Sequence, residues 1–372
     1  MRVELSQGDL LVMLQTVIDA VPTKGTLPVL STILMVAEGG ACSLSATDLE
    51  LSVTTTRPLE AMEEGRATFP ARKMLDIVRE LPPGQLTITE QDGRVTLRSA
   101  TGEYSMLGMP AAEFPTIPTG LEGIALSVDG DLLKRMISKS AFAVHPDDTR
   151  PTLNSVCWRV SPSNMTMVAT DGHRLAKVTE EVATGYEQTR QVIVPPRVLQ
   201  QAVKLMREDN ALERVTIGER QIHFAYTAAD MFGRLVEGAY VDVDAVIPKD
   251  NDRHLLISVE AMMPAVRRML ILSSQQNHQV RVALRENAVE LSTLNRETGA
   301  EARESVEAEY SDEPMEIGYN ANYLLEVLNK MDTEQVRLKF REAVSAAIIE
   351  PAKQLDGEEH FCLLMPLRPV DA

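Results

Sequence analysis

The most enzyme-like segment of the chain is the run Thr170-Asp171-Gly172-His173-Arg174. A carboxylate and an imidazole in one tight turn are able to exchange protons with a substrate, so a hydrolase that uses Asp171 and His173 is one hypothesis. A structural interpretation competes with it, because an Asp in a turn commonly hydrogen-bonds its own backbone. Elsewhere the chain has no phosphate-binding GxxxxGKS or GxxxxGKT loop, no GxSxG elbow and no compact metal-ligand spacing.

A related segment elsewhere in the chain favours the structural interpretation. Met167 to Asp171 matches Leu44 to Asp48 and, more faintly, Leu291 to Asn295. The threonines of these segments stand at 47, 170 and 293, so both intervals are 123 residues. The first copy continues as Asp48-Leu49-Glu50, without His or Arg. A turn explains both aspartates, so we expect no catalytic residue, no metal site and no cofactor.

A second landmark repeats with nearly the same period. Pro70, Pro195 and Asn320 each precede a helix-like run, and each is 125 residues from the next. The period is too long for a solenoid, whose units run about 20–50 residues. It suits a small domain that buries its own core. We therefore expect three similar domains, at residues 1–121, 122–250 and 251–372.

The same order of elements is expected in each copy. A strand and a helix come first, then alternating strands around a turn, then a second helix at the Pro or Asn landmark, and finally a β pair. Ser6 and Asp9 resemble a capping box at the start of the first helix. In the third copy Pro264 is expected in the first helical turn, where a missing N–H costs little. Two helices packed on antiparallel sheets give an α+β fold.

Composition limits the setting of the protein. The three cysteines, Cys42, Cys157 and Cys362, lie far apart, which fits a reducing cytoplasm and no disulfide framework. The start of the chain does not read as a signal peptide. No apolar run approaches the roughly 18 residues of a membrane span, so we expect a cytoplasmic protein without a membrane partner.

The net charge of −17 argues against nucleic acid as a partner, because duplex binding normally depends on Lys and Arg. The distribution of the cations softens this objection. Basic residues cluster in the predicted helices, as Arg72 with Lys73, Lys134 with Arg135 and Lys139, and Arg197 with Lys204. One alternative is that these are ordinary solvated charges. The other is a basic helical face on an acidic body, which would attract a polyanion weakly.

The chain resembles a known family, the β subunit of bacterial DNA polymerase III, which is the sliding clamp. The resemblance runs nearly end to end. It is carried by Thr26 to Leu30, Ala46 to Glu50, Pro70 to Lys73, Ala111 to Pro115, Ala169 to Ala176, Ile193 to Pro195, Glu316 to Asn320 and Met365 to Arg368.

The resemblance implies three tandem clamp domains and a head-to-tail homodimer that forms a six-domain ring. Such a ring is a non-enzymatic processivity factor of the DNA polymerase III holoenzyme. It encircles double-stranded DNA without sequence preference and slides on it. Polymerase catalytic subunits, the clamp loader and repair proteins would bind through short hydrophobic motifs. The DNA-binding positions implied are Lys24, Arg72, Lys73, Arg150 and Arg197, although Pro151-Thr152 replaces an aromatic pair that the family usually has after Arg150.

Two protein-binding surfaces are also implied. At the dimer interface Tyr104 and Met106, on an edge strand, would face Ile271 and Leu272 at a helix end. A peptide-binding cleft between the second and third domains would comprise Leu153, Thr170, Gly172, His173, Arg174, Leu175, Val246, Asn320, Tyr323, Val344, Ser345, Met365, Pro366, Leu367 and Arg368.

The chain departs from the family pattern in one loop. The family usually carries a Pro and an Arg before Ile247, and this chain has Val241 to Ala245 there, with Asp242 and Asp244. An alternative function is therefore a clamp paralogue specialised for altered partner binding or inhibitor resistance.

Overall fold

The computed structural model describes residues 1–24, 27–59 and 63–367. The chain divides into two compact units, which are described separately below. The first comprises Met1–Leu133 and Arg197–Leu235, and the second comprises Lys134–Pro196 and Val236–Ala372. The middle third of the sequence is thus shared between the two units.

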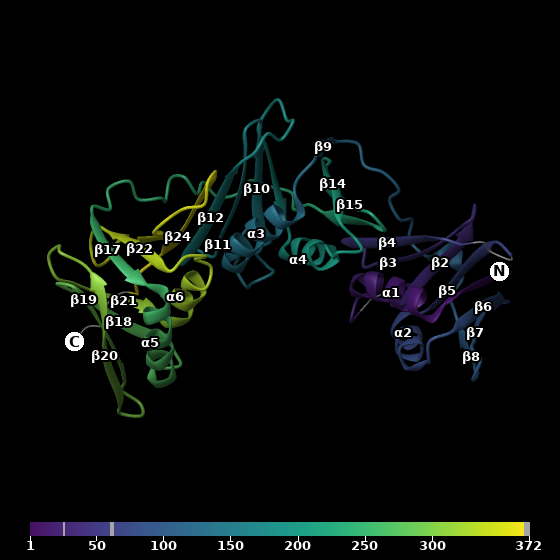
Figure 1. Ribbon diagram of the computed structural model, residues 1–372, viewed down its shortest axis with the longest axis horizontal. Coiled ribbons are helices and arrows are strands. Elements are labelled where there is room, and N and C mark those ends of the chain that lie inside the picture. Colours follow the sequence, from purple (N-terminus) through teal and green to yellow (C-terminus); the bar gives the residue numbers. More distant parts are fainter. Residues whose placement is uncertain (25–26, 60–62, 368–372) are drawn as a thin grey trace. The chain divides into compact units, whose positions relative to one another are not determined.

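The described residues contain six α-helices, two in each third of the chain. They are α1 (Gln7–Val17), α2 (Ala71–Glu80), α3 (Gly130–Ser140), α4 (Pro196–Leu205), α5 (Val259–Leu272) and α6 (Ala321–Leu328). Figure 1 shows α5 and α6 side by side, and α5 lies against β18, β19 and β20. Helix α1 packs in the same way on α2, β3 and β4. None of the helices in the described ranges is long and apolar enough to span a membrane.

Within the described residues the named strands form three antiparallel sheets. The first unit holds a sheet in the order β1 (Arg2–Ser6), β6 (Gln85–Gln91), β7 (Arg94–Arg98) and β8 (Glu103–Leu107). It also holds one in the order β5 (Gly65–Pro70), β2 (Thr32–Glu38), β3 (Ala41–Thr47), β4 (Leu51–Pro58), β16 (Ala229–Arg234), β15 (Gln221–Tyr226), β14 (Leu212–Ile217) and β9 (Ile124–Leu126).

The second unit holds the longest sheet. Its order is β13 (Arg190–Val194), β10 (Val156–Ser161), β11 (Asn164–Thr170), β12 (Arg174–Glu181), β24 (Glu358–Leu364), β23 (Ala347–Pro351), β22 (Gln335–Phe340), β17 (Arg253–Ser258), β20 (Ala300–Glu309), β19 (Ala288–Asn295), β18 (Gln279–Arg285) and β21 (Met315–Asn320).

These strand orders contain one pattern three times. Four strands run in the orders β5-β2-β3-β4, β13-β10-β11-β12 and β21-β18-β19-β20, and four more in the orders β1-β6-β7-β8, β9-β14-β15-β16 and β17-β22-β23-β24. The triplication and the α+β class expected from the sequence are confirmed. Both landmarks have the same structural role in each copy, since the Thr segment ends a strand and the Pro or Asn segment begins a helix.

Neighbouring copies are joined by strand pairing. In the first unit β4 pairs with β16, with Leu51 opposite Gly233. In the second unit β12 pairs with β24, with Arg174 opposite Leu364. The fourth strand of one copy therefore hydrogen-bonds to the last strand of the next.

The helix starts follow the sequence, with one correction. The hydroxyl of Ser6 accepts the amide of Asp9 at 3.0 Å, so the predicted cap of α1 is confirmed. The prediction for Pro264 was wrong. Helix α5 starts at Val259, which puts Pro264 in the second turn, where it has no N–H to donate to the carbonyl of Glu260.

A second correction concerns α3, whose cations do not form an exposed basic face. Lys139 is 2% exposed, and its ammonium lies 2.7 Å from the carboxylate of Glu358 on β24. Arg135 reaches both Glu180 on β12, at 2.7 Å, and Glu358, at 3.3 Å. Burial raises the pKa of Glu180, and its bond to Arg135 acts in the opposite direction. These cations neutralise buried carboxylates between the second and third copies.

Removal of one cation from this cluster should destabilise the second unit. We expect Lys139→Ala to lower its stability by about 3 kcal/mol or more, because Glu358 is left buried with half of its compensation. Urea denaturation followed by fluorescence of Trp158 reports on this unit, since Trp158 is the single tryptophan and lies buried in β10. The control is Arg281→Ala, which breaks an exposed pair with Glu316 and should cost about 1 kcal/mol or less. Equal effects of the two changes would contradict the prediction.

Candidate functional site

The segment Thr170 to Arg174 is a turn stabilised by its own side chains. One carboxylate oxygen of Asp171 accepts the amides of His173 and Arg174 at 2.8 and 2.9 Å. The other oxygen accepts Nε of Arg174 at 3.2 Å. Asp171 thus bonds Arg174 and backbone amides, whereas the His173 ring stacks on Tyr323, with the ring centres 6.2 Å apart. The geometry supports the turn interpretation over an Asp–His catalytic pair.

The other two copies use the same turn. Asp48 accepts the amides of Glu50 and Leu51 at 3.0 and 2.7 Å, and Asn295 accepts those of Glu297 and Thr298 at 3.1 and 3.2 Å. Gly172 has φ +88° and Leu49 has φ +79°, so the first two copies share a left-handed residue after the aspartate. An amide oxygen therefore serves this turn as well as a carboxylate does.

Arg174 connects the turn to helix α6. Its side chain is 8% exposed, and its guanidinium contacts Glu326, donates to the carbonyl of Phe142 at 3.0 Å and lies over the ring of Tyr323 at 4.6 Å. All of these partners belong to the second unit. Arg174 therefore positions Tyr323 and the start of β12, with its donors directed at groups of its own chain.

The register of the sheet gathers most of the predicted cleft residues. Leu364 lies opposite both Arg174 and Ala347, so the start of β12, the end of β24 and the start of β23 share one end of the sheet. The amide of Met365 extends this pairing to the carbonyl of His173, at 2.9 Å, and Leu367 bonds Gly318 ahead of α6 at 2.8 Å. Residues far apart in the sequence thus meet beside the turn.

Three of the predicted cleft residues have apolar side chains that face solvent. Val246, Val344 and Met365 are 60%, 63% and 44% exposed. We call these three residues the apolar surface. Thr170 and Leu175 are buried, whereas Leu153, Ser345, Pro366 and Leu367 are half-buried. The side chain of Asn320 caps α6 through the amides of Asn322 and Tyr323. Arg368 lies outside the described residues.

The loop Val241 to Ala245, which departs from the family pattern and is called the altered loop below, is held against the sheet. Tyr240 and Val243 are buried in one cluster with Leu175. Asp244 lies 3.1 Å from the ammonium of Lys177 on β12 and 3.2 Å from the guanidinium of Arg159 on β10. Hydrogen bonds from Lys177 and Arg159 hold the pKa of Asp244 below its usual range.

Three of the predicted DNA-binding residues share one cavity of about 810 Å³ in the first unit. Lys24, Arg72 and Arg197 line it together with Lys204, Asp19 and Asp48. Lys73 follows Arg72 on α2 and is exposed. Arg150 is exposed in a loop of the second unit, where its amide bonds Asp147.

The predicted interface residues occupy accessible positions. Among the described residues β8 pairs only with β7, and Tyr104 and Met106 on it are half-buried. Ile271 and Leu272, at the end of α5, are 78% and 38% exposed. All four are thus available for contact, unlike core residues.

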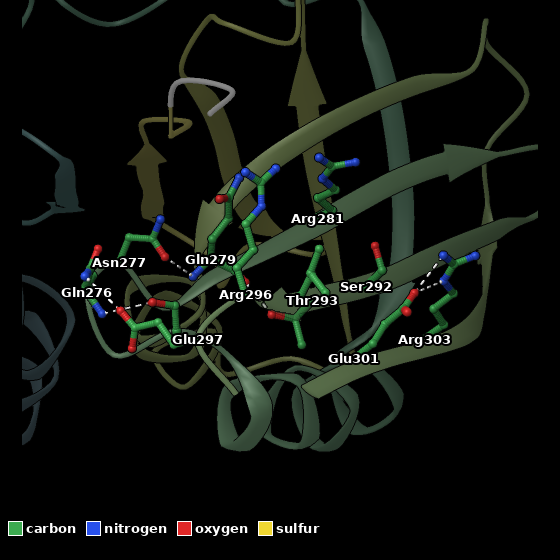
Figure 2. Close-up of a pocket in the computed structure, with 12 residues that line it drawn as sticks. Gln276, Asn277, Gln279, Arg281, Ser292, Thr293, Arg296, Glu297, Glu301 and Arg303 are labelled. Atoms are coloured by element: carbon green, nitrogen blue, oxygen red, sulfur yellow. Dashed lines mark hydrogen bonds and ion pairs between the residues drawn. The ribbon is translucent and has the colours of Figure 1, made fainter. Parts of the chain in front are cut away.

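A polar cavity of about 330 Å³ lies on β18, β19 and β20, in the longest sheet of the second unit (Figure 2). Its carboxylates are already engaged, since Glu297 accepts Nε2 of Gln276 at 3.1 Å and Glu301 pairs with Arg303 at 2.7 Å. Its lining contains no His or Cys to act as a base or strong nucleophile. This cavity gives no support to the hydrolase hypothesis.

Comparison with known proteins identifies the family. Models of the N-terminal, central and C-terminal domains of the DNA polymerase III beta subunit match residues 1–118, 127–242 and 244–368. The chain belongs to this family, the beta sliding clamps. Its members are DNA polymerase processivity factors, which confirms the resemblance and the function class expected from the sequence.

Individual relatives match over their whole length. The beta sliding clamp of Pseudomonas putida is 31% identical, and that of Escherichia coli K12 is 32% identical. The first match covers 99% of this chain and 100% of the relative, as does the second. The crystal structure of the DNA polymerase III subunit beta from Pseudomonas aeruginosa has a TM-score of 0.94 at 32% identity, over 99% of this chain and all of that one. Another, bound to griselimycin, has a TM-score of 0.93 at 31% identity and covers 99% of each chain.

Sequence reasoning missed several residues that contact the predicted ones. Glu326 and Phe142 hold Arg174, whereas Asp19 lies beside the cations of the first unit. Nothing in the residue types distinguishes these side chains from ordinary surface or core positions. The spacing of the repeat was the one available signal, because it puts Glu326 on the helix that follows the landmark Asn320.

The contribution of Asp244 to holding the altered loop can be tested by removal of its charge. We expect Asp244→Asn to increase hydrogen exchange at residues 240–247 near pH 7, and Asp242→Asn, an exposed neighbour, to leave it unchanged. In the native protein, the stability that the Asp244 ion pairs contribute is fully present above the usual Asp pKa of about 3.9. It is lost as the pH falls through the lowered pKa of Asp244, because the protonated group no longer attracts Lys177. Equal exchange in both variants would contradict the tether.

Proposed function

We propose that the protein is a DNA polymerase processivity factor: two chains close into a ring around duplex DNA and tether polymerases through short hydrophobic peptides. The three domains are proposed to span residues 1–121, 122–250 and 251–372. The protein acts in the cytoplasm and has no catalytic activity of its own. Family membership supports the function, and the strand pattern supports the assembly.

One observation carries the ring. Between copies, the fourth strand of one copy pairs with the last strand of the next, as in β4 with β16 and β12 with β24. Among the described residues, β20 of the third copy lacks the partner that this pattern requires, and so does β8 of the first. Within the described residues, Ala300 to Glu307 of β20 pair with β19 alone. A second copy of the chain would supply both missing partners.

The exposed apolar residues agree with this assembly. Ile271 and Leu272 precede the β18–β20 segment, and Tyr104 and Met106 lie on β8. We propose that these four side chains pack together where β8 of one chain meets β20 of the other. Apolar contacts beside a shared strand pair would close the interface.

DNA is held by enclosure, so few contacts are needed. Arg72, Arg197 and Lys24 in the cavity of the first unit are proposed to face phosphates, together with Lys73 and Arg150. Because phosphate contacts carry no sequence information, such binding is independent of sequence. A net charge of −17 is compatible with it, since the charge that matters is local.

The apolar surface is the proposed client-peptide site, together with the other residues of the predicted cleft. Exposed Val and Met side chains suit varied hydrophobic peptides. Gly172, without a side chain, leaves room for a peptide backbone to approach the turn. Arg368 extends the proposed site beyond the described residues.

The alternative is a clamp paralogue with altered partner or inhibitor preference. Its support is the loop in which Asp242 and Asp244 stand and Asp244 is fixed by Lys177 and Arg159. A panel of client peptides with acidic or basic flanks would decide between the two: loss of all binding to ordinary hydrophobic motifs would favour the paralogue.

The ring is tested by size and by topology. In sedimentation the protein should have twice the 41.0 kDa mass of one chain, and once assembled on circular duplex it should remain there until the DNA is linearised. The double variant Ile271→Ala with Leu272→Ala should be monomeric and lost from circular DNA, because buried Leu and Ile truncations typically cost about 2–5 kcal/mol each. Leu355→Ala, which removes an exposed Leu between β23 and β24, is the control and should stay dimeric. An unchanged sedimentation coefficient in the double variant would refute the interface.

The client site is tested by deletion of Met365 to Ala372. We expect loss of binding to hydrophobic client peptides, measured by fluorescence anisotropy, with the dimer intact. Met365→Ala alone should weaken binding to a smaller extent, because it removes one exposed apolar side chain. Dimer loss in the deletion, or full peptide affinity, would overturn this assignment.

A further inference from the structure

The cavity of the first unit contains carboxylates that oppose its proposed use. Its wall carries four cations, Lys24, Arg72, Arg197 and Lys204, and two carboxylates, Asp19 and Asp48, a net charge of +2. A phosphate site has no evident use for acidic residues. Their contacts show how they are used.

Asp48 is paired with Arg197. One oxygen of its carboxylate is fixed by the amides of Glu50 and Leu51, so the side chain has a set direction. The other oxygen contacts the guanidinium of Arg197, at the start of α4. Asp48 is 8% exposed as a side chain whereas Arg197 is 53% exposed, so the pair is anchored on the carboxylate side and open on the cation side.

Asp19 makes two contacts with the same helix. Its carboxylate pairs with the ammonium of Lys204, two turns along α4 from Arg197, and its backbone carbonyl accepts a guanidinium N–H of Arg197 at 3.1 Å. Lys204 is 63% exposed. By contrast, the side chains of Lys24 and Arg72 make no hydrogen bond or ion pair within the described part of the chain.

The turn itself does not require a charge at Asp48. Asn295 accepts the corresponding two amides in the third copy with a neutral amide oxygen. The negative charge of Asp48 therefore acts outside the turn, and the group it meets is Arg197.

We propose that Asp19 and Asp48 are built-in competitors of DNA phosphates, which mask Lys204 and Arg197 until DNA displaces them. This rests on the proposed function, in which the cavity faces DNA. Each phosphate contact by a masked cation requires an internal ion pair to open, so the net gain per contact is small. Contacts that cost little to break suit a protein that has to slide. Asp19 and Asp48 are thus positioning residues for DNA binding. Lys24 and Arg72, which have no such partner among the described residues, are the cations for first contact.

The masking of Arg197 and Lys204 is tested with variants of the full-length dimer in which a neutral Asn replaces Asp48 or Asp19. Binding to a short fluorescein-labelled duplex at low salt is measured by anisotropy. We expect Asp48→Asn and Asp19→Asn each to bind about threefold to fivefold more tightly than wild type, the range of an exposed ion pair. Their affinity should also fall more steeply with salt, since no freed carboxylate takes up a cation when phosphate binds. Asp92→Asn is the matched control, because Asp92 lies in a turn at φ +52° that Asn tolerates and outside this cavity.

The outcomes are distinct. In one outcome, wild type binds the duplex, Arg72→Ala weakens that binding, and the Asp19 and Asp48 variants bind no more tightly than Asp92→Asn. This result overturns the masking proposal and leaves the proposed function standing. No wild-type binding to any duplex overturns both. A merely structural Asp48 predicts a lower melting temperature for Asp48→Asn and no gain in affinity. If that variant does not fold, Asp19→Asn decides, since Asp19 lies outside the turn and is 35% exposed.

Discussion

The structure depends above all on strand pairing between consecutive copies of one module. Each module by itself leaves the outer edge of its fourth strand unpaired, and the last strand of the next module covers it, in β4 with β16 and in β12 with β24. Open strand edges are unfavourable in isolation because their amides and carbonyls lack partners. The Asx turns stand directly before these strands, at Asp48 before β4 and at Asp171 before β12. A local turn thus fixes where long-range pairing begins.

The same turns determine how charge is distributed at the junctions. In the first unit the turn supplies the acid, Asp48, and helix α4 of the next copy supplies Arg197. In the second unit the turn supplies Arg174 and the helix supplies Glu326. Repeated backbone geometry has therefore been combined with opposite charges. One junction presents cations in an open cavity, whereas the other buries its cation and leaves apolar side chains exposed nearby.

An acidic protein is able to serve a polyanion when its cations are partitioned in this way. Lys139 and Arg135 form ion pairs with buried carboxylates, and removal of either partner strongly destabilises the fold. Arg197 and Lys204 are paired at the surface, where the interaction is weak and exchangeable. Residue type is the same in both sets, and burial decides the role. Net charge accordingly predicts little about the binding surface.

The sequence by itself determined the triplication, the α+β class, the helix starts at Ser6 and Asn320 and the family, because repeated spacing and capping are local properties of the chain. It also indicated that Asp48 and Asp171 hold turns. Spacing was a poor guide to Pro264, since helix α5 begins earlier than its apolar pattern suggests. Only the tertiary structure separated Lys139 from Lys204, joined Glu326 to Arg174 and put Asp19 beside α4. Those contacts join residues that are distant in the sequence, and no local pattern encodes which charged side chain will be buried and which will face water.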